Sequence, residues 1–266
     1  MAFGDLKGTL TGKTVSITDP MPGTGSVSVA LQDLILFMIS ETTGMTTVGV
    51  TDNLGNTYAS PNAYDGGNLS SVLYYSVVTI AGTLTTINAN TTASTRDAAV
   101  SAAVIEGPFA ASGALDVATA WATGDTASPY PCPASGVLAQ ADELVVACGG
   151  RYLGRALVAT SPNLLAIGTF SGTTDGQSGS VLAAIGYQVV ASTSSVTPEF
   201  TGSGITSEST FATFSFKKEL PGQPAAKRMG NIPHASRIRG RGNNKMWREA
   251  LSGLLVPDNR LIGVRA

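Results

Sequence analysis

The chain has 266 residues, enough for one large β domain or two small ones, and only 13% of them are charged, about half the ~25% that soluble domains usually carry. Its net charge is −2, its longest apolar run, Leu34–Ile39, is far shorter than the ~20 residues of a membrane helix, and its start lacks a secretory signal pattern. These features exclude a transmembrane-helix protein, and we expect a soluble chain made in the cytoplasm.

Strand-length segments recur through the first 216 residues, while helical periodicity is almost absent. The predicted strands are residues 26–30, 34–40, 46–51, 71–79, 85–89, 98–106, 115–120, 143–149, 164–170, 180–191, 195–201 and 210–217. Strands at this spacing, joined by turn-forming residues, predict an all-β fold, namely an antiparallel β-sandwich of jelly-roll-like type. We place this body at residues 26–217, after an N-terminal segment, residues 1–25.

Two local patterns refine the strand prediction. Residues 51–58, TDNLGNTY, are typical of a hairpin, because Asn53 and Gly55 tolerate the positive φ of tight turns. Residues 71–79 are apolar on both faces, which indicates a central strand.

An internal echo suggests two related half-units, residues 26–120 and 135–217. The segment VALQDLILF from Val29 is echoed by VLAQADELVVA from Val137, and DGGNLSSVLYY from Asp65 by DGQSGSVLAAI from Asp175. The spacing between the echoes is nearly the same in both halves. The alternative is that biased composition produces similar hairpins twice.

Cys132 and Cys148 are the only cysteines, and two at this separation fit neither a zinc ligand set nor a disulfide framework. We expect free thiols, with Cys148 buried in the strand LVVAC and Cys132 in a loop. A disulfide between them is the alternative.

After residue 217 the composition changes, which predicts an extended, basic C-terminal arm over residues 218–266. Three prolines and two glycines within LPGQPAAKRMGNIPH prevent regular structure, and the basic stretch RIRGRGNNK follows. Residues 245–255, KMWREALSGLL, could form a short helix with one apolar face. The predicted docking residues are the cations Arg237, Arg239, Arg241, Lys245 and Arg248 and the apolar anchor Trp247, Leu251, Leu254 and Leu255.

The net charge conceals opposite charges in body and arm. Residues 1–216 contain 5 Lys or Arg against 15 Asp or Glu, a balance of −10, whereas residues 217–266 contain 11 against 3, a balance of +8. A basic arm on an acidic body predicts a negatively charged partner, either nucleic acid or the acidic body of another subunit. We favour the protein surface, because an acidic body repels nucleic acid and the arm has one aromatic residue for base stacking, Trp247.

The sequence offers no catalytic constellation, so we expect no enzyme activity and no cofactor. The single histidine, His234, lies between Pro233 and Ala235 in the arm, and no phosphate-binding loop, HExxH or GxSxG motif is present. Asp142 and Glu143 are adjacent acids, but neighbours on a strand point to opposite faces and cannot flank one glycosidic bond.

Turn acids and loop aromatic residues are the candidates for metal and sugar sites. Three turn acids, Asp52, Asp65 and Asp175, could offer oxygens to calcium, but their spacing matches no known loop, and we expect no metal site. Trp121, Tyr130 and Tyr152 lie in or near predicted loops, where they could stack on the rings of a host glycan, although core packing is the commoner role.

Three segments resemble known modules: VTDNLGNTY at residues 50–58, QADELVVA at 140–147 and the closing strand TFATFSFK at 210–217. On these, residues 26–217 resemble the β-sandwich and jelly-roll-like modules of tailed-phage virion proteins and related bacterial surface proteins. The resemblance implies a virion structural protein of the decoration, spike, collar or fibre type, and it provides no catalytic residue.

The leading hypothesis is therefore a virion component, synthesised in host cytoplasm, whose arm docks onto capsid, connector or tail subunits and onto copies of itself. The alternative hypothesis is a glycan-binding module that recognises a host receptor on behalf of a virion or bacterial surface.

Overall fold

The computed structural model describes residues 2–14, 21–42, 44–92, 97–123, 129–152, 157–160, 171–172, 176–178, 181–202 and 208–220. Within these residues the protein forms eighteen β-strands and no helix, so the all-β prediction is confirmed. The chain divides into two compact units, Met1–Ala226 and Lys227–Ala266, and the second lies outside the described residues.

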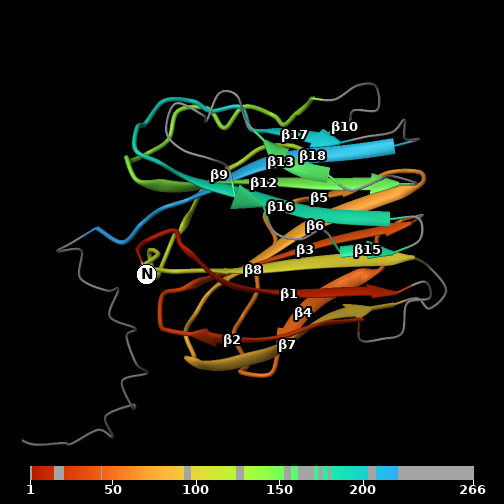
Figure 1. Cartoon of the computed structure of the whole chain (residues 1–266), viewed down its shortest axis with the longest axis horizontal. Helices are drawn as coiled ribbons and strands as arrows, with labels where there is room; N and C mark the ends of the chain where they lie inside the picture. The colour runs from red at the N-terminus through yellow and green to blue at the C-terminus, as the bar shows by residue number, and fades with distance from the viewer. Residues whose placement is uncertain are drawn as a thin grey trace, which may run out of the picture. The chain divides into compact units, whose positions relative to one another are not determined.

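The first eight strands form one antiparallel sheet (Figure 1). Their bounds are β1 Leu6–Thr14, β2 Met21–Val29, β3 Leu34–Thr42, β4 Thr47–Asp52, β5 Ala63–Asp65, β6 Leu69–Val77, β7 Gly82–Thr91 and β8 Ala98–Ile105. The strand order is β4-β7-β2-β1-β8-β3-β6-β5. Residues 1–25, which the sequence analysis sets apart from the body, thus supply β1 and the start of β2, and β1 pairs with β8 along its whole length.

The remaining strands form a seven-stranded and a three-stranded sheet. The seven-stranded sheet contains β9 Leu115–Ala118, β10 Ala122–Thr123, β12 Glu143–Tyr152, β14 Ser171–Gly172, β15 Gly176–Ser178, β16 Val181–Val190 and β18 Glu208–Phe216. The three-stranded sheet has the order β11-β17-β13, with bounds Tyr130–Pro131, Glu199–Gly202 and Leu157–Thr160.

Strand pairing in the second half follows that in the first. In the first half β3 lies between β6 and β8, β1 pairs with β8, and β5 pairs with β6. In the second half β12 lies between β16 and β18, β9 and β10 pair with β18, and β15 pairs with β16. The trio β4-β7-β2 likewise corresponds to β13-β17-β11.

The register of the smaller trio is also preserved. Met21 pairs with Ala89, and Pro131 pairs with Glu199, so both partners are displaced by 110 positions (131 − 21 and 199 − 89). The same displacement relates the pair of Val50 and Ala89 to the pair of Thr160 and Glu199. One displacement thus relates both strand pairs of the two trios.

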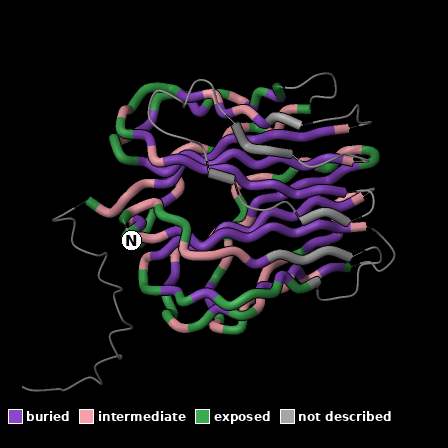
Figure 2. Tube along the Cα trace, viewed as in Figure 1, coloured by how far each residue is buried: buried purple, intermediate pink, exposed green. Residues whose placement is uncertain are grey.

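Two hydrophobic cores bury opposite faces of the central strand β3. Its even-numbered residues, from Leu34 to Met38, lie in a core shared with the second half, whereas Ile35, Phe37 and Ile39 lie in a core shared with β2 and β7. Two-sided burial explains why Leu34–Ile39 is a continuous apolar run rather than an alternating one. Figure 2 shows the central strands buried along most of their length.

Strand β12 repeats this arrangement. Leu144, Val146 and Cys148 lie in the core shared with β3, β6 and β8, while Val145 and Ala147 lie in smaller cores on the other face. Each such side chain contributes roughly 1.5–3 kcal/mol by leaving water. The contact between the two halves is therefore a large, continuous part of the hydrophobic interior.

The hairpin at residues 51–58 is wrong, because β4 pairs with β7 and the loop is followed by β5, which pairs with β6. Gly55 has a positive φ of 87°, but Asn53 does not; the side chain of Asn53 accepts hydrogen bonds from the β7 backbone instead.

The predicted strand at residues 164–170 lies outside the described residues. No helix in the described part of the chain could cross a membrane.

Candidate functional site

Residues 106–114 connect β8 of the first half to β9 of the second, and we call them the connector. The end of the described chain is bonded to this connector. Ala110 N donates to Lys217 O at 3.1 Å, Glu219 N donates to Pro108 O at 2.9 Å, and Lys218 forms a β-bridge with Phe109. Lys218 and Glu219, which the sequence analysis assigned to the arm, therefore pair with the body, and residues 221–266 lie outside the described residues.

The first charged cluster, Lys7, Asp33 and Glu106, lies where the connector begins. Lys7 Nζ is 2.7 Å from Asp33 Oδ2 and 3.1 Å from Glu106 Oε2, and the Asp33 side chain is only 2% exposed. Asp33 also accepts the backbone amides of Ala30, at 2.7 Å, and Gly107, at 3.0 Å. Burial alone would lower the pKa of Lys7, but the hydrogen bonds and attraction of its two acidic partners raise it.

The second charged cluster, Asp116, Glu143 and Lys217, lies where the connector ends. Lys217 Nζ is 3.6 Å from Asp116 Oδ1, and fully buried Glu143 accepts the amide of Gln140 at 3.0 Å. Its other oxygen, Oε2, is buried and accepts no hydrogen bond within the described residues. Burial, and then the nearby Asp116 carboxylate, raise the pKa of Glu143.

The two clusters occupy equivalent backbone positions. Leu6 pairs with Ile105 and Leu115 with Phe216, and at both places the register shifts, so that Lys7 and Asp116 are the extra residues of two β-bulges. A bulge redirects its side chain out of the regular alternation. Both halves therefore use the same device to present a charged group beside a buried acid.

The buried acids are held alike as well. Asp33 and Glu143 each follow a residue with positive φ, Gln32 at 67° and Asp142 at 59°, the only such non-glycine residues in the described part of the chain. Each acid also accepts the amide three positions before it. Glu143 is buried at the start of β12, whereas Asp142 precedes the strand and is exposed, so the two acids lie in different environments.

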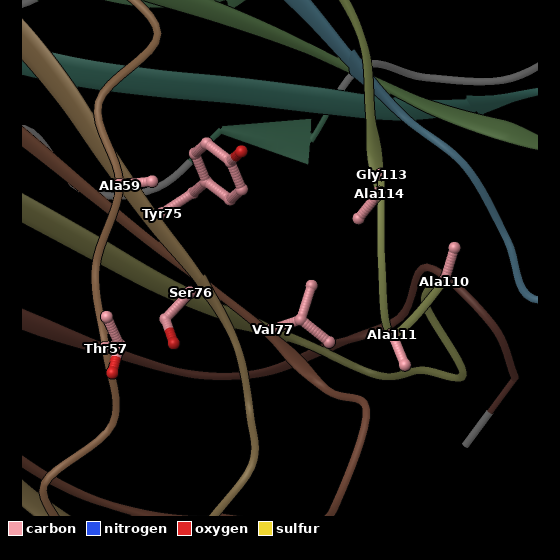
Figure 3. Close-up of a pocket in the computed structure, with 9 residues that line it drawn as sticks. All are labelled: Thr57, Ala59, Tyr75, Ser76, Val77, Ala110, Ala111, Gly113 and Ala114. Atoms are coloured by element: carbon pink, nitrogen blue, oxygen red, sulfur yellow. The ribbon is translucent and has the colours of Figure 1, made fainter. Parts of the chain in front are cut away.

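A pocket of about 200 Å³ opens beside the connector (Figure 3). One wall is the connector itself, and the others come from residues 57–59 and strand β6. Its lining is Thr57, Ala59, Tyr75, Ser76, Val77, Ala110, Ala111, Gly113 and Ala114. The lining contains no charged residue, histidine or cysteine, and it exposes both polar and apolar groups, so the pocket offers no side chain suited to acid–base chemistry.

The comparisons returned no match. Neither protein-family models, nor curated proteins, nor solved structures resemble this chain at a significant level. Its function must therefore be argued from its own residues.

The predicted docking residues, all in the arm, lie outside the described residues, and so does His234. The three aromatic residues predicted to contact a glycan are described, and each is packed into the body. Tyr130 is 5% exposed and stacks on Phe211 at 5.6 Å, while its hydroxyl accepts a hydrogen bond from buried Arg151. Trp121 contacts Phe214 edge-on, and Tyr152 packs against the core shared by the halves. Core packing thus explains Tyr130, which would have to leave its site to meet a sugar.

The turn acids that were weighed as calcium ligands bind their own backbone. Asp52 accepts the amides of Leu54, Gly55 and Asn56, and Tyr58 donates to its second oxygen at 2.9 Å. Asp65 accepts hydrogen bonds from Met45 N and Ser70 Oγ, whereas Asp175 lies outside the described residues. These bonds are the chemistry of turns and of loop anchoring.

Both cysteines are free and buried, which confirms the expected thiols. Burial raises the pKa of Cys132 and of Cys148, so neither is a ready nucleophile.

Sequence reasoning missed both charged clusters. The echo of LQDL by ADEL aligned Asp33 with Glu143, which was a usable signal for the buried acids. Lys7 and Asp116 gave no signal, because only the bulges bring them to those acids.

Proposed function

We propose that the protein is a non-catalytic structural subunit of a large assembly, in which a duplicated β-sandwich body is joined to neighbours by its basic C-terminal arm. The proposal includes the role suggested by resemblance, a virion component of the decoration, spike, collar or fibre type. The observation on which it rests is the opposite charge of the two parts, −9 for residues 1–220 against +7 for residues 221–266, on a chain whose residues 217 and 219 bond the connector.

The interpretation of the body as two related sandwiches is supported by the repeated pairing order and by the equivalent bulges. Each half has its own core between a larger and a smaller group of strands, and the larger groups face each other across the shared core. A duplicated, jelly-roll-like body of this kind is a stable spacer. Its outer faces can bind neighbouring subunits without a conformational change.

The non-catalytic role is supported by how the described acids are used. Asp33, Glu41 and Asp52 each accept several hydrogen bonds from nearby backbone or side-chain groups, and Glu208 binds Tyr64 Oη at 2.9 Å and Asn68 N at 3.3 Å. These acids stabilise loops and strand ends. None of them lines the pocket.

The test compares the full chain with a chain that ends at Leu220. We expect the full chain to form a closed oligomer, with a copy number in multiples of three, five, six or twelve, that dissociates as salt screens the arm. The shortened chain should stay monomeric with an unchanged circular dichroism spectrum. Light scattering gives both masses, and a full chain that is monomeric at low salt and high concentration contradicts the proposal.

A further inference from the structure

We propose that the pocket in Figure 3 receives the apolar face of residues 245–255 from a second copy of the chain, with Trp247 as the side chain that fills it. This inference rests on the proposed function, because it names the surface to which the arm docks. It makes the contact head-to-tail, one copy's arm on the next copy's connector.

The lining of the pocket combines small apolar side chains with polar groups, which fits an aromatic side chain that also carries a polar edge. Ala110, Ala111 and Ala114 form the connector wall, and Tyr75 and Val77, both half-buried, lie across from it. Tyr75 is already packed edge-on against Phe216, with ring centroids 5.1 Å apart, so its position is set by the core. A rigid aromatic floor with a wall of small residues is a hole that suits a single aromatic knob.

The arm starts beside this wall. Glu219 bonds Pro108 through its amide, and its carboxylate accepts the amide of Ala111 at 3.3 Å. Leu220, the last described residue, is 45% exposed. The remaining 46 residues, 221–266, follow Leu220 in the chain and contain a single tryptophan, Trp247.

The composition of the arm favours a neighbour's pocket over its own. Pro221, Pro224 and Pro233 favour extended polyproline II backbone, which rises ~3.1 Å per residue, so residues 221–233 can span roughly 40 Å. A body of about 220 residues has a radius of gyration of only ~17 Å. The arm is thus long enough to reach beyond its own body, and the charge of +7 on residues 221–266 favours binding to the acidic body of another copy.

The first experiment fills the pocket in the full chain. Ala111→Trp blocks it from an exposed wall position that tolerates a larger residue, and Ser112→Trp is the matched control, because Ser112 is exposed, adjacent and outside the lining. We expect Ala111→Trp and Trp247→Ala each to weaken self-association roughly tenfold or more, and Ser112→Trp to change it less than about twofold. Sedimentation velocity over a concentration series measures the association, and circular dichroism checks the fold.

A second experiment identifies whose arm is bound. Chains carrying Ala111→Cys and chains carrying Met246→Cys, with different tags, are mixed and treated with a short bismaleimide. The native thiols are buried and react slowly, so the unsubstituted chain is the blank. We expect a cross-linked product that contains both tags.

The outcomes separate the two proposals. If Ala111→Trp associates like the native chain while Trp247→Ala does not, or if no product with both tags forms, the pocket inference is overturned and arm docking survives. If the chain ending at Leu220 associates as tightly as the full chain, arm docking fails as well.

Discussion

The two charged clusters show the same backbone device with different charges. In the first half a lysine, Lys7, stands in the bulge, faces the buried acid and is flanked by Glu106. In the second half the bulge holds an acid, Asp116, and the lysine has moved to Lys217. Each cluster has two acids and one cation, so the net formal charge is the same. The bulge and the buried carboxyl group are therefore present in both clusters, whereas the cation and the second acid exchange positions between them.

The different order has an energetic consequence. Asp33 is in direct contact with a cation, whereas Glu143 has an acid as its charged neighbour and a raised pKa. The buried carboxylate of Asp33 is therefore stabilised by its ion pair with Lys7. The carboxyl group of Glu143 is stabilised either by protonation or by hydrogen bonds that offset the free energy lost when its charge is buried. Stability should depend on pH differently in the two halves.

Asp33→Ala should give the largest effect among single changes in these clusters. It removes the acceptor of two backbone amides and leaves Lys7, whose side chain is 11% exposed, with Glu106 alone. We expect a loss of about 3–5 kcal/mol in the free energy of unfolding, measured by urea titration at pH 7. Asp33→Asn is the control of similar shape and should lose less. A loss below about 1 kcal/mol would show that the first cluster is not held by its ion pair.

Gly150→Ala tests the contact between the halves, on the strand that carries Glu143. A Cβ at Gly150 would collide with the hydroxyls of Ser71 and Ser40 and lie 3.1 Å from Thr210 Oγ1. These hydroxyls are fully buried and bonded to one another, so they have little room to yield. We expect a loss of about 1–3 kcal/mol, partly recovered when Ser71→Ala is added.

Gly49→Ala is the matched control for this change, because a Cβ there meets nothing within 4 Å. It should alter the free energy of unfolding by less than about 0.5 kcal/mol. If the two alanine variants unfolded at the same urea concentration, the shared core would be less tightly packed than the structure indicates.

Much of the fold could be predicted from local patterns. Apolar runs identified β3, β8, β12 and β18, because a strand buried on both faces has few polar residues to obscure it. Strand β1, LKGTLTGKT, was missed because its two glycines and two lysines belong to residue types that are depleted in strands. Its strand character comes from pairing with β8, a partner some 90 residues away, which no local pattern reports.

The similarity in strand pairing between the two groups of strands was also visible in part in the sequence. The echoes around Leu34 and Leu144 reflect equivalent strands, since Leu34 pairs with Ile105 and Leu144 with Phe216. The charged clusters and the pocket could not be predicted, because each brings together residues from segments far apart in the chain. Lys7 and Asp116 occupy equivalent positions but carry opposite charges, so a search of the sequence for repeated residues does not detect them.

Glu143→Gln should stabilise the second half at neutral pH. Because the folded pKa of Glu143 is raised, the folded chain binds more protons than the unfolded chain above pH ~4.3, and native stability falls as the pH rises through this range. Glutamine has no proton to lose and can donate a hydrogen bond to Asp116. We expect a gain of about 1 kcal/mol at pH 7 that disappears near pH 4, measured by urea unfolding at both values. A loss at pH 7 would mean that the carboxylate itself is required.

A double variant can give the second cluster the charge arrangement of the first. Combining Asp116→Lys with Lys217→Glu places a cation in the bulge and an acid after β18, as in Lys7 and Glu106. Asp116 also accepts the amide of Ala139 at an exposed position, where water can replace it, so the change in stability at pH 7 should stay within about 1 kcal/mol. The pH dependence should change more, because a neighbouring lysine lowers the pKa of Glu143 and removes the decline in stability from pH 4 to 7. Asp116→Lys alone, which leaves two lysines near one buried acid, is the control. An unchanged pH profile in the double variant would show that burial alone, rather than the order of charges, sets the titration of Glu143.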